Sequence, residues 1–239
     1  MTKDAEFKVS SALRPRKKPV QGRSKLKIEK ILEGAQDVMR EKGVRAVTTH
    51  AIAAAAGANV ASIYQYFPNK EAIIQALYEQ KLISIRSKLG ELTESLDLRD
   101  WKAAVYQLVF DVKHFEEEIG FDRTIIEATQ HYPLLEETWR AHADRTAKTV
   151  RQLMRRIGSS WSDKALYDLA LYVYSVSTAT WNYWRLKDTE AEIGLHRQAV
   201  ATVALFALAI ESDSDVSLPV PRKSVAGTRT TPPLRARTR

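Results

Sequence analysis

The stretch Thr48–Lys70, TTHAIAAAAGANVASIYQYFPNK, contains the pattern that decides the fold. Thr48 can cap a short helix over the alanine-rich run, and Gly57 supplies a turn because glycine adopts positive φ without strain. Asn59 can then cap a second short helix over 60–67. Two short helices joined by a tight glycine turn form a helix-turn-helix, whose second helix can enter the major groove of DNA.

The outer face of the helix over 60–67 carries side chains suited to DNA. Ile63 and Phe67 lie four residues apart and share a face, which should pack on the neighbouring helices. The other positions include small residues that let the backbone approach base edges, Gln65, which can pair with adenine, and hydroxyls that suit phosphate oxygens. We therefore predict DNA contacts at Thr48, Thr49, His50, Asn59, Val60, Ala61, Ser62, Tyr64, Gln65, Tyr66 and Lys70.

The alternative for Tyr64 and Tyr66 is that both are ordinary core aromatics. Two residues apart on a helix, they cannot face the same core, so at least one should be partly exposed. His50 at the start of a helix is as readily a solvated residue as a base contact.

Charge is unevenly distributed along the chain. The 239 residues carry a net charge of +8, with +7 in residues 1–30, +6 in residues 216–239 and −5 between them. Basic ends commonly follow phosphate backbones, although charged tails can also serve solubility alone. We predict a flexible basic arm over 1–22, a disordered basic tail over 211–239, and backbone contacts from Arg14, Arg16, Lys17, Lys18 and Arg23.

Composition excludes several classes of site and suggests a compartment. With no cysteine in the chain, disulfides, thiol nucleophiles and thiolate metal sites are excluded. The most apolar run, Ala199–Ile210, is shorter than the roughly 18 residues that span a bilayer, so we expect it to be buried against protein. The protein is expected in the bacterial cytoplasm, associated with the nucleoid.

Periodic apolar residues predict helices throughout the central part of the chain. No segment shows sustained strand alternation bounded by hairpin turns. The pattern predicts an all-α protein with a three-helix head over 23–70, a larger helical body over 71–210, and a linker over 90–100. The predicted helices lie at 24–42, 48–56, 60–67, 70–89, 101–118, 121–130, 134–157, 162–187 and 189–210.

These motifs resemble those of the TetR family of bacterial transcriptional regulators. The resemblance covers residues 24–75 and implies an all-helical homodimer whose C-terminal domain binds a ligand and dimerises. It also implies a four-helix interface formed by the helices at about 162–187 and 189–210. The matching motifs are Ile31–Ala35, Gly43, Thr48, Ile52–Gly57, Tyr64-x-Tyr66-Phe67 and Asn69-Lys70-Glu71.

Three positions depart from the family pattern. Ala58 stands where a valine is frequent, so the core at the turn is less filled. His50 replaces a common arginine, which puts one DNA contact in doubt. Asn59 replaces a frequent serine, a change that helix capping tolerates.

The body is rich in aromatic residues on helices, and helical bundles bind small molecules in apolar cavities between helices. We expect an apolar or aromatic effector, although most of these aromatics would serve equally well in the core or a dimer interface. The candidate pocket residues are Tyr106, Phe110, His114, Trp139, His142, Tyr172 and Trp181.

Metal and catalytic chemistry are not indicated by the sequence. His114 shares a helix face with Glu117 and Glu118, but the acidic run over 116–118 is typical of a solvated surface, so no metal site and no cofactor are predicted. No nucleophile and base stand in a catalytic order, so we do not expect an enzyme.

The leading hypothesis is a sequence-specific transcriptional regulator, a repressor released from a palindromic operator by a small molecule. One alternative is a non-specific DNA-organising or scaffold protein that uses the same head and the basic tails. Another is a helical small-molecule-binding protein or enzyme with a vestigial head. The sequence does not separate repression from activation.

Overall fold

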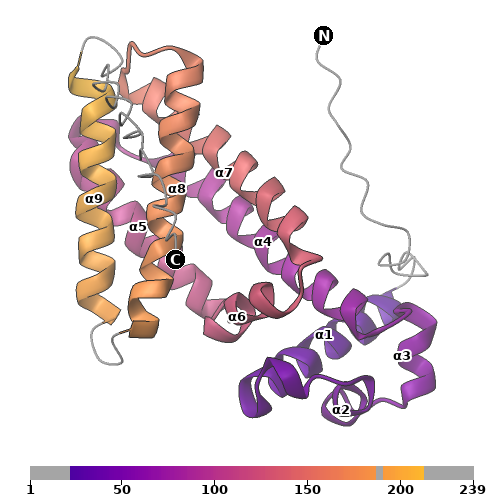
Figure 1. Cartoon of the computed structure of the whole chain (residues 1–239). Coiled ribbons are helices and arrows are strands. Elements are labelled where there is room, and N and C mark those ends of the chain that lie inside the picture. The colour runs from indigo at the N-terminus through magenta and orange to yellow at the C-terminus, as the bar shows by residue number, and fades with distance from the viewer. Residues whose placement is uncertain (1–21, 187–190, 213–239) are drawn as a thin grey trace, which may run out of the picture.

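The computed structural model describes residues 22–186 and 191–212, which are helical and contain no strand. Figure 1 shows a small head of α1, α2 and α3 at one end of α4, and a bundle of α5, α7, α8 and α9 at the other. The helices are α1 (Gly22–Lys42), α2 (Thr49–Ala55), α3 (Val60–Tyr66), α4 (Lys70–Ser95), α5 (Trp101–Glu118), α6 (Arg123–His131), α7 (Leu135–Ile157), α8 (Asp163–Leu186) and α9 (Ala191–Glu211), with short 3-10 turns at Val44–Ala46 and Leu98–Asp100.

The short helices of the head start where their capping residues predict. Thr48 Oγ1 accepts a hydrogen bond from the backbone N–H of Ala51 at 3.0 Å, and Asn59 Oδ1 accepts one from Ser62 at 2.7 Å. Asn69 caps α4 in the same way. Each cap contributes about 1 kcal/mol, which matters for helices too short to be stable alone. The predicted all-α class and the predicted starts of these helices are confirmed.

Close packing between α1 and α2 holds the helix-turn-helix on its scaffold. A Cβ added at Gly34 would lie 2.9 Å from the backbone nitrogen of Ala56 and 3.1 Å from the carbonyl oxygen of Ile52. Only glycine therefore lets the two helices approach this closely. Gly57, with φ of 60°, turns the chain from α2 into α3 as predicted.

The head does not have a separate hydrophobic core. Ile63 and Phe67, both fully buried, belong to one cluster that continues through the first half of α4 to Phe121, just before α6, and Ile125 in its first turn. The head is therefore packed as one unit with the first half of α4 and the start of α6.

The linker predicted over 90–100 is wrong in its first half, because α4 continues through Gly90 to Ser95. Leu89 and Thr93, on either side of the glycine, are buried. A glycine inside a helix costs about 1 kcal/mol relative to alanine, and burial of its neighbours offsets that cost. Gly90 is consequently a tolerated interior residue rather than a helix end.

The last helix packs on the bundle by one face only. Ala199, Phe206 and Ala209 are buried, whereas Val200 and Leu208 are exposed. The segment Glu192–Glu211 is long and apolar enough to cross a membrane by length and composition, and 28% of its most apolar window is buried. The expectation that the apolar run is buried against protein is therefore correct for one of its faces.

Candidate DNA-binding face and effector cavity

The outer face of α3 presents small and polar side chains to solvent. Ala61 and Gln65 are exposed, Tyr64 is 43% exposed, and Val60 is half-buried at the start of the helix. Ile63 faces the opposite way and is fully buried. The helix is thus fixed by its inner face and free to approach base edges with its outer one.

Tyr66 does not lie on this outer face, contrary to the sequence prediction. Only 9% of it is exposed, and it packs with Phe67 in the head core. The expected exposure of at least one of the two tyrosines is met by Tyr64. Because α3 ends at Tyr66, the chain bends there and carries its ring inward.

The capping residues keep hydrogen-bonding capacity toward DNA. The Thr48 hydroxyl accepts from the backbone and can still donate its proton, and the Asn59 amide still has its two N–H groups. His50 is exposed, and Thr49 and Ser62 are half-buried. Both helix N-termini therefore offer donors suited to phosphate oxygens.

Lys70 has an intramolecular role that the sequence did not indicate. Its ammonium donates to the carbonyl oxygen of Val47 at 3.1 Å and lies 6.0 Å from the centre of the Tyr132 ring. The contacts tie the start of α4 to the chain before α2 and to α6. A phosphate contact from Lys70 would have to share the ammonium with these partners.

The predicted arm and tail lie outside the described residues. This applies to Arg14, Arg16, Lys17 and Lys18, and to the chain beyond residue 212. Arg23 lies in the first turn of α1, and its side chain is outside the described part.

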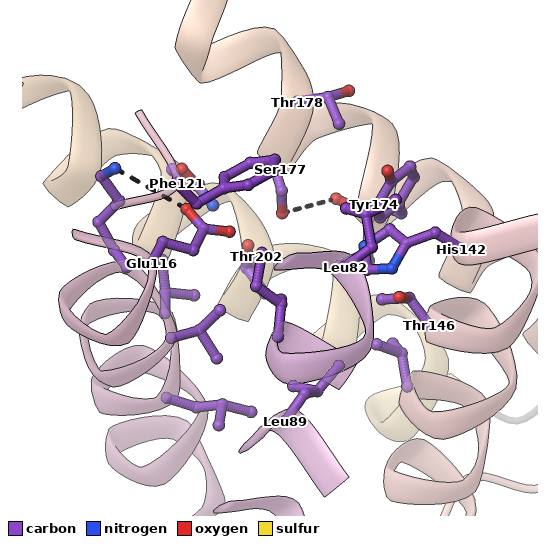
Figure 2. Close-up of a pocket in the computed structure, with 18 of the residues that line it drawn as sticks. Leu82, Leu89, Glu116, Phe121, His142, Thr146, Tyr174, Ser177, Thr178 and Thr202 are labelled. Atoms are coloured by element: carbon purple, nitrogen blue, oxygen red, sulfur yellow. Dashed lines mark hydrogen bonds and ion pairs between the residues drawn. The ribbon is translucent and has the colours of Figure 1, made fainter. Parts of the chain in front are cut away.

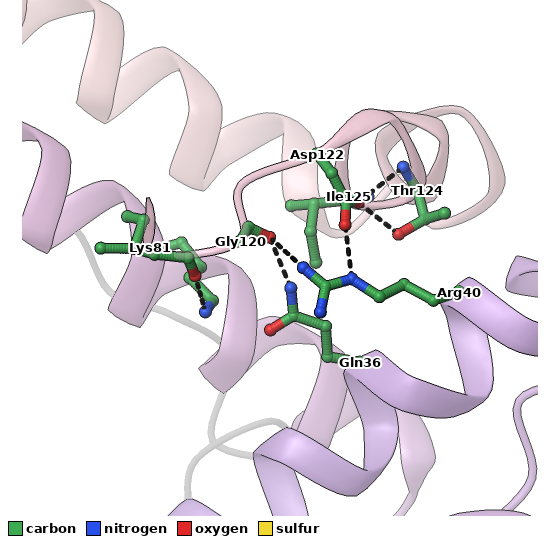
Figure 3. A network of polar contacts seen from close by, with 8 residues as sticks. Gln36, Arg40, Lys81, Gly120, Asp122, Thr124 and Ile125 are labelled. Atoms are coloured by element: carbon green, nitrogen blue, oxygen red, sulfur yellow. Dashed lines mark hydrogen bonds and ion pairs between the residues drawn. The ribbon is translucent and has the colours of Figure 1, made fainter. Parts of the chain in front are cut away.

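A turn over residues 119–122 connects the head to the body (Figure 3). Gln36 on α1 donates to the carbonyl oxygen of Gly120, and Arg40 Nε donates to Asp122 Oδ2 at 2.6 Å. Lys81 on α4 donates to the carbonyl oxygen of Ile119. Gly120 has φ of 71°, a backbone conformation that favours glycine.

Asp122 is well suited to hold this turn. Burial alone would raise the pKa of Asp122, but hydrogen bonds from Thr124 and Arg40 outweigh it and keep the pKa below its usual value. The carboxylate also caps α6 through the backbone N–H of Thr124 at 2.9 Å. It therefore joins the start of α6 to the end of α1 as a charged group at neutral pH.

A cavity of about 360 Å³ lies in the body between α4, α5, α7, α8 and α9 (Figure 2). Most of its wall is apolar, with Leu82, Leu89, Val105 and Leu108 among the lining residues. Its volume is at the small end of the roughly 300–1,000 Å³ range of small-molecule sites. Glu116, which precedes the 119–122 turn, and Phe121, which lies within it, also line the cavity, so the cavity and the turn share a wall.

Glu116 and Lys113 are the charged side chains of the described cavity wall. Their side chains are 16% and 9% exposed, and Lys113 Nζ lies 3.8 Å from Glu116 Oε2. Burial raises the pKa of Glu116 to about 7, and burial lowers the pKa of Lys113. The prediction that residues 116–118 form a solvated acidic run is therefore wrong for Glu116 and right for Glu117 and Glu118, which are exposed.

His142 stands in the cavity wall contributed by α7. It is 5% exposed, and burial together with Arg86 and Arg145 lowers its pKa to about 3. Its Nδ1 lies 3.3 Å from Arg86 Nη1, and its ring meets the Tyr174 ring edge-on at 5.6 Å between centroids. The imidazole is therefore neutral at physiological pH and acts as a hydrogen-bonding group.

The predicted pocket residues are not brought together in one site. Trp139 and His142 line the cavity. Tyr106 and Phe110 instead border an open cleft against the start of α9, where the Tyr106 hydroxyl lies 2.6 Å from His196 Nδ1. His114 is exposed, Tyr172 is 60% exposed, and the side chain of Trp181 lies outside the described residues. The prediction failed because aromatic content does not tell which helix face points inward.

The sequence prediction missed the polar groups that distinguish the cavity. The hydroxyls of Thr146 and Thr202 are buried and have no hydrogen-bond partner among the described residues. A signal for Glu116 was present, since Val105, Val109, Val112 and Glu116 follow one another at helical spacing on a single face of α5. Within the described ranges, no three His, Asp or Glu side chains are grouped as a metal site.

Comparison with known proteins finds a family model that matches most of the head and the start of α4. A family model described as bacterial regulatory proteins of the tetR family matches residues 31–77. The matched segment contains the helix-turn-helix formed by α2 and α3. This confirms the resemblance inferred from the motifs of residues 24–75. No curated protein sequence matches the chain.

Solved structures with the TetR fold match most of the chain. A protein assigned to the TetR-family transcriptional regulators, from Mesorhizobium loti, has a TM-score of 0.61 at 19% identity over 78% of this chain and 98% of its own. SmeT, the repressor of the multidrug efflux pump SmeDEF of Stenotrophomonas maltophilia, in complex with triclosan, has a TM-score of 0.57 at 18% identity over 76% and 90%. FadR from Bacillus subtilis, in complex with stearoyl-CoA, has a TM-score of 0.57 at 18% identity over 76% and 98%. The likeness shows that this chain has the fold of TetR-family regulators, with a helix-turn-helix head and a larger helical body.

Proposed function

We propose that this protein is a sequence-specific DNA-binding transcriptional repressor that a small molecule releases from its operator. The outer face of α3 carries the proposal, because Ala61, Tyr64 and Gln65 are exposed on a helix whose inner face is fully packed. Such a helix can read base edges in the major groove while the caps of α2 and α4 contact phosphates. We assign this role to residues 23–70 and effector binding and dimerisation to residues 71–210.

The proposed active form is a homodimer through α8 and α9. Ile193, Val200 and Leu208 follow one another seven and eight residues apart on α9 and are 44%, 50% and 39% exposed, and Tyr172 on α8 is 60% exposed. An apolar stripe of this kind is expected to be covered by protein. A twofold dimer would place two copies of α3 in successive major grooves about 34–36 Å apart, so the operator should be nearly palindromic.

The cavity and the 119–122 turn suggest how an effector would act. Glu116 and Phe121 line the cavity, and Gly120 and Asp122, between and beside them, contact α1 of the head. A molecule that fits the cavity in only one position of this turn would favour one head position over the other. Its effect on DNA affinity is limited to its differential affinity for the two states.

The neighbouring structures support a small-molecule effector. SmeT was solved with triclosan and FadR with stearoyl-CoA, so this fold accommodates ligands of different size. The cavity of this chain supports the same use. We place the protein in the bacterial cytoplasm, on DNA, with the basic ends adding phosphate contacts that steepen the salt dependence of binding.

Sequence-specific DNA binding is tested with a variant at Gln65. In fluorescence anisotropy, the protein should bind the DNA upstream of its own gene more tightly than scrambled DNA of equal length. Gln65→Ala should relax the preference at one base pair by roughly 1–3 kcal/mol. Gln80→Ala, an exposed glutamine on α4, is the matched control and should change nothing. Equal affinity for both DNAs in the unmodified protein would contradict a specific regulator.

A variant at Tyr64 distinguishes contacts to the DNA backbone from contacts to the bases. Tyr64→Ala should weaken binding to all sequences alike, because a phosphate contact carries no base information. Lys70→Ala would also weaken binding, but it removes the hydrogen bond to Val47 as well, so its effect combines DNA contact with head stability. A Tyr64→Ala protein that binds all DNA as before would favour the alternative of a vestigial head.

A non-specific DNA-organising protein is the second candidate, and the charge distribution favours it. The net charges of +7 in residues 1–30 and +6 in residues 216–239 would suffice for non-specific binding. Deleting residues 1–20 and 216–239 discriminates between the two. The repressor should keep its operator preference with a shallower salt dependence, whereas the scaffold protein should lose nearly all of its affinity.

A further inference from the structure

Two carboxylates share one ammonium at the cavity wall and the adjoining surface of α5. Lys113 Nζ lies 3.5 Å from Glu117 Oε1 and 3.8 Å from Glu116 Oε2, so two carboxylates share one lysine. Glu117 is 62% exposed and can also be solvated, but Glu116 is 16% exposed and faces the cavity. Above the pKa of Glu116 the three groups therefore carry one surplus negative charge, and Glu116 is the less solvated of the two carboxylates.

The surroundings of Glu116 suit a cation. Tyr78, Phe121, Trp139 and Tyr174 line the same cavity, and aromatic ring faces attract ammonium groups. Figure 2 shows the Phe121 ring beside the Glu116 carboxylate at one end of the cavity and Leu89 at the other. An elongated molecule would thus find a negative, aromatic end and an apolar end.

A second anchor lies on α9. Thr202 is 5% exposed, lines the cavity, and its hydroxyl has no hydrogen-bond partner among the described residues. A buried hydroxyl without a partner is unfavourable, and a bound polar group would relieve that cost. The Thr146 hydroxyl on α7 also lines the cavity and likewise has no hydrogen-bond partner among the described residues. The cavity is therefore suited to a molecule that carries a second polar group in addition to a charged one.

We infer that the effector is an amphipathic amine with one cationic nitrogen, whose ammonium pairs with Glu116, whose apolar body lies along Leu82 and Leu89, and whose second polar group meets Thr202. The inference rests on the proposed use of this cavity as the effector site. An anionic ligand would have to displace a carboxylate from Lys113 and would then lie next to Glu116. Two negative charges placed side by side in a buried site repel each other strongly.

Three probes of equal chain length test the charge preference. Decylamine, decanol and decanoate carry a positive, a neutral and a negative head on the same apolar chain. Isothermal titration of the full-length protein at pH 8, without DNA and below the aggregation limit of each probe, should rank the affinities in that order. Decylamine should bind roughly tenfold or more tightly than decanol, as expected for a charge-assisted hydrogen bond.

Two glutamate variants locate the preference. Glu116→Gln should reduce the affinity for decylamine to that for decanol while leaving decanol binding unchanged, which also shows that the cavity is intact. Glu118→Gln, an exposed glutamate on the same helix, should preserve the amine preference in full. Thr202→Val should leave decylamine binding unchanged but weaken 10-amino-1-decanol, which carries a second polar group.

The preference should also depend on pH. Among the described residues, the titratable groups around Glu116 are Lys113 and Glu117 on α5, Tyr174 on α8, and Tyr78 on α4, which interacts with Tyr174. Burial raises the pKa of Glu116 to about 7, so the carboxylate is largely protonated at pH 6 and largely charged at pH 8. The preference for decylamine over decanol should therefore increase between pH 6 and pH 8, and Glu116→Gln should abolish this increase.

Several outcomes would overturn the inference. These are tighter binding of decanoate than of decylamine, an amine preference that survives in Glu116→Gln, or no binding of any of the three probes. Operator binding by the ligand-free protein is measured separately. A protein that binds its operator but none of the probes contradicts the amine class alone, whereas one that binds amines but no operator contradicts the proposed function.

Discussion

The head and the body of this protein use apolar residues in different ways. In the head, Ile52, Ile63 and Phe67 are fully buried, and α1 approaches α2 so closely that Gly34 has no room for a methyl group. In the body, the bundle surrounds a cavity of about 360 Å³ whose wall includes a buried carboxylate and two hydroxyls with no hydrogen-bond partner in the described part of the chain. Close packing gives α3 a fixed orientation, and the cavity gives the body a site that a ligand can complete.

The largest expected effect is on the packing of the head. Gly34→Ala places a methyl group against the backbone of Ala56 and Ile52, and overpacking of this kind costs roughly 1–3 kcal/mol. Urea unfolding should show the loss, and operator affinity should fall with it because α2 is displaced.

Gly90→Ala is the matched control, since it is also a glycine inside a helix but has open space around its Cβ position. It should stabilise the protein by up to about 1 kcal/mol. Changes of the same sign in both variants would show that helix propensity, rather than the contact between α1 and α2, decides the result.

The second prediction concerns two buried groups of the body with opposite pH dependence. Burial holds the pKa of His142 at about 3, so between pH 7 and 5 the unfolded chain takes up a proton that the folded protein refuses. Burial raises the pKa of Glu116 to about 7, so over the same range the folded protein takes up a proton first. The first effect lowers the free energy of unfolding by about 2 kcal/mol and the second raises it by about 2 kcal/mol, so they offset each other.

Removing either group should reveal the other in urea unfolding at pH 7 and pH 5. Relative to the unmodified protein, Glu116→Gln should lose about 2 kcal/mol on acidification and His142→Asn should gain about 2 kcal/mol. His50→Asn, at an exposed position of the head, should follow the unmodified protein. Parallel pH profiles in all four proteins would show that neither group is buried in solution as it is in this structure.

The smallest stability effect is expected where head and body meet. The side chains of Arg40 and Asp122 are 44% and 34% exposed, so a double-mutant cycle with Arg40→Ala and Asp122→Ala should give a coupling energy below about 1 kcal/mol. The response to a ligand should change much more, since the pair joins the 119–122 turn to α1. We expect Arg40→Ala to bind its operator nearly as before and to be released less completely by a saturating ligand.

Arg140→Ala, which breaks an exposed pair with Glu136 on α7, is the control for that measurement. Its ligand response should equal that of the unmodified protein. A normal response in Arg40→Ala as well would exclude the 119–122 turn as the path between the cavity and the head.

Local signals made the head largely predictable. Thr48, Asn59 and Asn69 cap their helices through side-chain oxygens a few residues away, and Gly57 turns the chain by its own backbone freedom. Such interactions require no knowledge of distant residues, so their positions follow from the order of the amino acids. The sequence prediction wrongly placed Tyr66 on the DNA-facing side of α3. The direction of its side chain depends on where α3 ends and on what the next helix packs against.

Long-range packing decided the effector site. The sequence by itself determined that this chain is all-helical, that it has a helix-turn-helix, and where most helices begin and end, because capping and periodicity act within a few residues. Only the tertiary structure decided that Glu116 faces a cavity, that Tyr106 and Tyr172 do not, and that Gln36 and Arg40 meet the turn more than 75 residues further along the chain. These placements depend on which helix faces which, and that choice is made by the summed packing of the whole bundle.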